Sequence, residues 1–211
     1  MRWKSTLAIL VVWLANTGTS SGLDYESIEA ETKERLLEGE IVLFPHQPDE
    51  DPGKEIDNRF VTMGMLLRGD RATIWEVIND KENADEFLDG VLESEILESE
   101  GNEMVAKQRT KVGGPRESYE YTLKYLLHPM ERSEFSFVEG EIRNVEGGWW
   151  ILEGSSEENF LVIYSLHIDA GFFAPQFVVK SGMKKSMPNT IRSTQQEVTR
   201  RMSASAVTET D

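Results

Sequence analysis

The amino-acid sequence predicts one domain of the α+β class, in which an antiparallel sheet is covered by a long C-terminal helix. Two observations lead to this prediction. Segments with a two-residue alternation of apolar and polar side chains follow one another over residues 91–168. From Pro175 onward, apolar residues instead recur at intervals of three, four or seven, which is typical of one stripe on a long helix. A sheet with one apolar face needs a cover, and this helix supplies it.

The chain begins with the features of an export signal. Met1–Lys4 is basic, Leu7–Leu14 is an unbroken apolar run, and residues 16–22 are small or polar, which is the order of a secretory signal. The apolar run rises about 12 Å as a helix, too short for the roughly 30 Å core of a bilayer. The alternative is a buried amino-terminal helix. The expected organisation is a signal peptide at 1–22, one folded domain at 23–202 and a disordered tail at 203–211. We expect the protein to be periplasmic or secreted.

The segment before the sheet is expected to contain one exposed helix and two strands. Residues 24–37 predict a short amphipathic helix whose few apolar anchors are Ile28, Leu36 and Leu37. Strands are predicted at Glu40–Phe44 and Arg59–Leu67, on either side of a proline-rich loop over 45–54.

Two short helices should follow these strands. Asp70 is a good N-cap for a helix with an apolar stripe that ends at Asn79-Asp80, and a second helix is predicted over Glu82–Phe87.

Six strands are predicted next, separated by glycine, proline or acidic turns. Their expected ranges are Val91–Glu98, Glu103–Lys111, Ser118–Leu127, Ser133–Val138, Trp149–Glu153 and Phe160–Ile168. In two of them the alternation is clean, so one side of the sheet should be apolar and the other wet. The apolar side should carry Tyr119, Tyr121, Leu123, Tyr125 and Leu127 from one strand, and Phe160, Val162, Tyr164, Leu166 and Ile168 from the other.

The final helix should present one apolar stripe to this sheet. Its members are Val179, Met183, Met187, Ile191, Val198 and Met202. Pro188 lies within the stripe and lacks a backbone N–H, so we expect a kink or break there.

Composition excludes several classes of function. The chain has no cysteine, so disulfides and thiolate chemistry are excluded. Its net charge of −16 argues against binding to nucleic acid. The charge is uneven: residues 80–103 contain ten acids and the single base Lys81, whereas residues 175–202 contain six bases and the single acid Glu197. The basic helix is expected to be a solvated face, with transient contact to an anionic membrane surface as the alternative.

Several local sequences resemble those of a known superfamily. Residues 74–80 (IWEVIND) and 87–91 (FLDGV) are similar to a tryptophan helix and an FLPGV-like turn. Residues 148–152 (GWWIL) are similar to a Gly-x-Trp-x-Leu strand, and residues 174–177 (APQF) and 187–191 (MPNTI) to signposts of a last helix. With the order of elements, these stretches resemble the START-like (SRPBCC, helix-grip) superfamily. The nearest group is that of polyketide cyclase/dehydrase and coenzyme Q-binding proteins.

The resemblance covers roughly residues 38–202 and implies a helix-grip fold, in which a curved antiparallel sheet wraps around the long C-terminal helix. It further implies that this helix stands off from the sheet and leaves a cavity for a hydrophobic molecule. A filled core is the alternative. Asp89 departs from the family pattern, since many relatives have proline there.

The residues expected to line such a cavity are Tyr119, Tyr121, Tyr125, Phe135, Phe137, Trp150, Tyr164, Leu166, Met183 and Met187. Glu117 is in phase with the tyrosines, so Glu117 and Tyr121 are the candidates for acid–base chemistry. An ion pair between Glu117 and Arg109 or Arg116 is the more ordinary role. The three histidines lack metal-ligand spacing, and we expect neither a metal nor a cofactor.

These observations favour an exported, non-catalytic carrier of a hydrophobic small molecule, such as a lipid, a quinone or a polyketide-like compound. One alternative is a cyclase/dehydratase-type enzyme that uses the pocket tyrosines and Glu117. The other is a protein-interaction module that meets a basic partner through the acidic face at 80–103.

Overall fold

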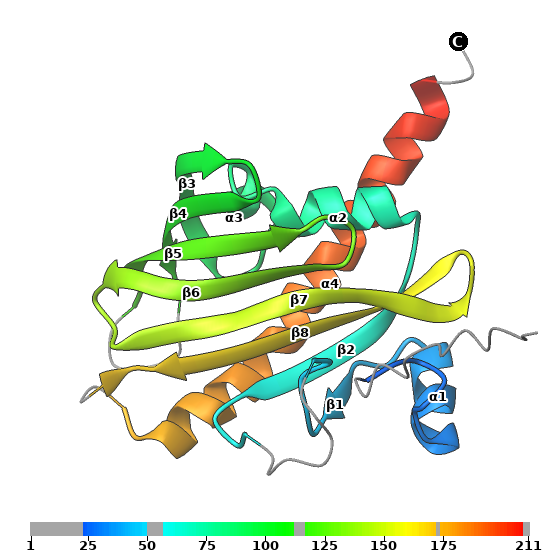
Figure 1. Ribbon diagram of the computed structural model, residues 1–211, viewed down its shortest axis with the longest axis horizontal. Coiled ribbons are helices and arrows are strands. Elements are labelled where there is room, and N and C mark those ends of the chain that lie inside the picture. Colours follow the sequence, from blue (N-terminus) through cyan, green and yellow to red (C-terminus); the bar gives the residue numbers. More distant parts are fainter. Residues whose placement is uncertain (1–22, 50–56, 112–116, 172–173, 209–211) are drawn as a thin grey trace, which may run out of the picture.

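The computed structural model describes residues 23–49, 57–111, 117–171 and 174–208. Their strands form one eight-stranded antiparallel sheet with the order β1-β2-β8-β7-β6-β5-β4-β3 (Figure 1). The strands are β1 (Val42–Phe44), β2 (Val61–Arg68), β3 (Val91–Glu100), β4 (Glu103–Thr110), β5 (Tyr119–His128), β6 (Arg132–Gly140), β7 (Asn144–Ser156) and β8 (Asn159–Asp169). Strands β3 to β8 form a meander, and β2 joins it by pairing with β8. The predicted α+β class and the six-stranded meander are confirmed.

Within the described ranges, four helices accompany the sheet: α1 (Ala30–Leu37), α2 (Arg71–Asn79), α3 (Ala84–Phe87) and α4 (Gln176–Thr208). Helix α4 crosses one face of the sheet diagonally, and α2 packs against it (Figure 1). Helix α2 begins as predicted, because Asp70 Oδ1 accepts a hydrogen bond from the backbone N–H of Thr73 at 2.8 Å.

Helix α4 differs from the prediction in two respects. It runs through Pro188 without a break. The proline removes one donor for the carbonyl of Lys184, an exposed residue where water can take the donor's place. The helix also continues to Thr208, so most of the predicted disordered tail is helical. Alanine and serine tolerate this conformation, and the Ser203 hydroxyl donates to the Thr199 carbonyl at 2.8 Å. Residues 209–211 lie outside the described residues, as does the predicted signal peptide.

The main core lies between α4 and the facing side of the sheet. The α4 residues Val179, Met183, Met187, Ile191 and Val198 are each at most 3% exposed. They pack against apolar side chains of β2 and β8. The predicted stripe is confirmed except for Met202, which is 38% exposed.

The opposite side of the sheet was expected to be wet, but part of it is buried. Leu161 and Ile163 of β8 are fully buried there, together with Leu66 and Trp150. The N-terminal segment covers them, with Ile28 among the residues that pack in this second cluster. The helical part of this segment is Ala30–Leu37, shorter than the 24–37 expected. The predicted anchors Ile28 and Leu36 are buried, but Leu37 is 61% exposed.

Candidate functional site

A cavity of about 280 Å³ lies between the sheet and α4. This volume is near the lower end of the roughly 300–1,000 Å³ typical of small-molecule sites. Its aromatic wall consists of Tyr121, Tyr125, Phe135, Trp149 and Tyr164. Its aliphatic lining includes Leu123, Val145, Leu166, Ile168, Val179 and Met183, and its polar lining includes Lys81, Asp89, Gln108, Thr110, Lys111, Ser186 and Thr190. Asp89, Lys111 and Ser186 are exposed, so the cavity reaches the surface between the α3–β3 turn and α4.

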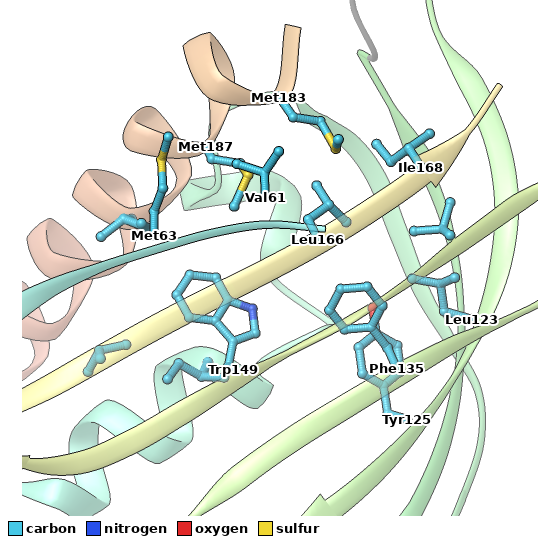
Figure 2. Close-up of a cluster of buried hydrophobic side chains, with 14 of the residues drawn as sticks. Val61, Met63, Leu123, Tyr125, Phe135, Trp149, Leu166, Ile168, Met183 and Met187 are labelled. Carbon is cyan, nitrogen blue, oxygen red and sulfur yellow. The ribbon is translucent and has the colours of Figure 1, made fainter. Parts of the chain in front are cut away.

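Cross-strand pairing builds the aromatic wall. Trp149 of β7 lies opposite Tyr164 of β8, and their rings stack at 4.2 Å between centroids. Tyr125 of β5 lies opposite Phe135 of β6, with 5.8 Å between ring centroids (Figure 2). Phe135 connects the two pairs through a tilted contact with Tyr164 at 6.5 Å. These contacts order the rings as one surface against which an apolar ligand can pack.

The tyrosine hydroxyl groups in the cavity form hydrogen bonds or are buried, and they stay protonated. The hydroxyls of Tyr121 and Thr110 lie 2.9 Å apart, and the Tyr125 hydroxyl donates to Gln108 Oε1 at 3.2 Å. Burial raises the pKa of Tyr121 and raises the pKa values of Tyr125 and Tyr164 further above the usual range. All three phenols therefore remain neutral at physiological pH.

Lys81 is the one buried cation among the described residues that line the cavity. Its residue is only 4% exposed, and its ammonium donates to the Ile78 carbonyl at 2.5 Å. Burial lowers the pKa of Lys81 from 10.5 to about 8, and the nearby charge of Asp80 opposes this shift only in part. Lys81 was not among the residues predicted to line the cavity, although it is the only base in the acidic segment 80–103.

Most of the predicted lining residues lie at the cavity. Those that line it are Tyr121, Tyr125, Phe135, Tyr164, Leu166 and Met183. Three others lie beside it and do not line it: Tyr119 and Met187 are fully packed in the core, and Phe137 is partly buried against the core. Whether any of them binds a ligand stays a prediction.

For two residues, the predicted position at the cavity is wrong. Trp150 lies on the opposite face of the sheet, where its indole Nε1 donates to Asp49 Oδ2 at 2.9 Å, and Trp149 takes the cavity position. The register explains this difference, because Trp149 is the residue paired with the inward-facing Tyr164. Glu117 is exposed and does not line the cavity. Arg109 forms its ion pair with Glu93, and the charge of Glu117 makes only a small contribution to raising the pKa of Arg109; Arg116, the other expected partner, lies outside the described residues.

The acidic segment 80–103 is partly neutralised within the domain. Asp80 pairs with Arg201 of α4 at 2.5 Å, Glu93 pairs with Arg109, and Glu103 pairs with Lys124 at 2.9 Å. Use of this face by a protein partner stays a prediction.

Within the described ranges, no helix combines the length and hydrophobicity needed to span a bilayer. In the same residues, no group of three or more His, Asp or Glu side chains is placed to hold a metal ion.

Comparison with solved structures identifies proteins with the same fold. The Zhui aromatase/cyclase from Streptomyces sp. R1128 is 18% identical, with a TM-score of 0.61, over 68% of this chain and 95% of that chain. Human StAR-related lipid transfer protein 5 is 15% identical, with a TM-score of 0.60, over 82% and 97%. A STAR-related lipid transfer protein from Xanthomonas axonopodis is 12% identical, with a TM-score of 0.59, over 75% and 98%. At these identities the similarity establishes the helix-grip START fold alone.

Sequence comparison establishes the family. No curated protein matches the sequence significantly. The model of one family, described as polyketide cyclase / dehydrase and lipid transport, matches residues 69–194. This match covers more than half of the chain and includes α2, the whole meander and the cavity-lining part of α4. The chain therefore belongs to the polyketide cyclase/dehydrase and lipid transport family, with a START-like domain for hydrophobic ligands.

Proposed function

We propose that this protein is an exported, non-catalytic carrier of a hydrophobic small molecule, which it holds between the sheet and α4. The observation that carries the proposal is the cavity of about 280 Å³, whose wall is mostly aromatic and aliphatic. Burying apolar ligand surface in such a site contributes about 25 cal/mol per Å², so binding requires few polar contacts. A lipid, a quinone or a polyketide-like compound has the necessary apolar body.

The state of the polar groups supports a carrier over an enzyme. The hydroxyls of Tyr121 and Tyr125 are engaged with Thr110 and Gln108, and their raised pKa values keep both groups protonated, which disfavours their use as general bases. Glu117, the acid–base candidate from the sequence, is exposed and outside the cavity lining. The similarity to an aromatase/cyclase keeps a cyclization or dehydration reaction as the second candidate function.

Export is supported by the sequence of residues 1–22, with its basic start, apolar run and small polar end. We expect the protein to be periplasmic or secreted and to begin near Leu23 after processing. N-terminal sequencing of protein recovered from outside the cytoplasm tests this expectation. A mature chain that still begins at Met1 would contradict it.

A neutral fluorescent dye tests the carrier proposal. We expect 1-aminoanthracene to bind saturably with one site, and Met183→Trp to weaken its binding at least tenfold. Met183 is 3% exposed and lines the cavity, so an indole there would occupy the ligand's space. Met202→Trp is the matched control, because Met202 lies on the same helix but is 38% exposed and outside the lining. Equal loss in both variants, or no saturable binding by the wild type, would contradict the proposal.

Recovery of the ligand separates the two candidate functions. A carrier releases its ligand unchanged after long incubation, whereas a dehydratase returns a product that has lost water and a cyclase returns an isomer of the same mass but a different chromatographic retention time. Liquid chromatography coupled to mass spectrometry of the extracted ligand distinguishes these outcomes.

A further inference from the structure

Lys81 is a buried lysine that lines the cavity. It is in the connection between α2 and α3, is 4% exposed and lines the cavity beside the aromatic wall. Its Nζ atom lies 4.9 Å from the ring centroid of Tyr125 and donates a hydrogen bond to the Ile78 carbonyl. An ammonium has three N–H donors, and the Ile78 carbonyl accepts from one of them, so Lys81 keeps donor capacity for a ligand.

The charge of Lys81 has no carboxylate partner at ion-pair distance among the described residues. Asp80, its neighbour, is engaged with Arg201 at 2.5 Å and with the Asn83 side chain at 2.8 Å. Asp89 at the cavity mouth is exposed and accepts from Asn189 at 2.9 Å.

The other ionisable groups around the cavity do not balance this charge either. The phenols of Tyr121, Tyr125 and Tyr164 are held neutral by burial, and Lys111 at the mouth is a second cation. A buried charge without a counter-charge is unfavourable, so an anion that enters the cavity gains more there than it would at an exposed lysine.

We propose that Lys81 forms an anion subsite in the cavity and that the protein selects hydrophobic ligands that carry a carboxylate. This inference rests on the proposed carrier function and names the chemistry of the polar end of the ligand. A lone ammonium matches a single negative charge, whereas phosphate groups are more commonly bound by several donors or by the fork of an arginine. The ligand's apolar body packs against the aromatic wall while its carboxylate accepts from Lys81 Nζ.

A matched pair of ligands tests the subsite. Decanoate and 1-decanol have the same carbon chain and differ in the charge of the polar end. We expect the wild type at pH 7 to bind decanoate at least tenfold more tightly than 1-decanol, as measured by calorimetry below the micellar concentration. A hydrogen bond to a charged group typically corresponds to a factor of about 10 to 100 in affinity. Lys81→Met should remove this preference and change the affinity for 1-decanol less than threefold. Lys184→Met, at an exposed lysine of α4, is the control and should keep the preference.

The wild type alone provides a second measurement that does not depend on the variant's folding. Its preference for decanoate over 1-decanol should fall towards one between pH 7 and pH 10, as Lys81 loses its proton. A preference that is absent at pH 7, that persists at pH 10 or that survives Lys81→Met would overturn the subsite and leave the carrier proposal intact. Failure of the wild type to bind either compound or the neutral dye would overturn the carrier proposal itself.

Discussion

Replacement of Lys81 by methionine should change how the stability of the domain depends on pH. Burial lowers the pKa of Lys81 from 10.5 to about 8 in the folded state, whereas the unfolded chain keeps the ordinary value. Between these two values the unfolded state binds more protons than the folded state, so the wild type becomes more stable as the pH rises. Below pH 8 both states are protonated, and the folded state carries the full desolvation penalty.

The size of the effect follows from the shift in pKa. Each pH unit between about 8 and 10.5 contributes roughly 1.4 kcal/mol to the free energy of unfolding, which gives about 3 kcal/mol over the whole interval. Between pH 7 and pH 9.5 the expected gain is about 2 kcal/mol. The window stops at pH 9.5 because tyrosines of the unfolded chain begin to ionise near pH 10, which acts in the opposite direction.

Urea denaturation at pH 7 and pH 9.5 measures this effect in the wild type, Lys81→Met and Lys184→Met. The difference in free energy between Lys81→Met and the wild type should shift by about 2 kcal/mol in favour of the wild type at the higher pH. Titrations common to all three proteins cancel in this difference, and Lys184→Met should follow the wild type. Parallel pH profiles for Lys81→Met and the wild type would refute the claim that the lysine is buried as a cation.

Four further substitutions test the packing and the charges of the domain. Glu197→Gln should make the free energy of unfolding less dependent on pH in acid, because the arginine partners of Glu197 lower its pKa to about 2. In the wild type, the stabilisation by Glu197 is present above about pH 4.5 and is lost as the pH falls towards 2. An unchanged midpoint of acid unfolding in the variant would contradict this. Gly147→Ala should destabilise the domain by about 3 kcal/mol, since the added Cβ would lie 2.1 Å from a backbone carbonyl oxygen. At Gly182 on α4 an added Cβ meets nothing within 4 Å, so Gly182→Ala should stabilise the domain by roughly 0.5–1 kcal/mol. Thermal unfolding measures both effects. Tyr121→Phe removes the hydrogen bond to Thr110 and should lower the free energy of unfolding by about 1 kcal/mol without weakening dye binding; lost dye binding would indicate that the hydroxyl contacts the ligand.

The sequence was sufficient for the architecture because each element has a local signal. Strands β5 and β8 alternate cleanly, α2 has an aspartate cap, and the α4 stripe recurs with helical spacing. Apart from α4, which continues through Pro188 and to Thr208, the incorrect predictions concern tertiary packing. The alternation of β8 indicates which residues share a face, but it does not show that Leu161 and Ile163 are covered by the N-terminal segment.

The site was harder to predict than the fold for the same reason. In the pair Trp149-Trp150, only the strand register decides which indole faces the cavity, and the register with Tyr164 selects Trp149. Lys81 was missed because its burial depends on the connection between α2 and α3 folding over the cavity. In the sequence, it is one base among ten acids and is typical of a solvated surface.

Native mass spectrometry of the exported protein, before and after organic extraction, tests most directly whether the cavity holds a hydrophobic molecule. We expect the wild type and Met202→Trp to carry one defined non-covalent mass that extraction removes, and Met183→Trp to lack it. The contrary result is that all three proteins show the mass of the polypeptide alone and that no mass shift follows when lipids, quinones or decanoate are offered. This result would show that the cavity carries no ligand and would contradict the proposed function.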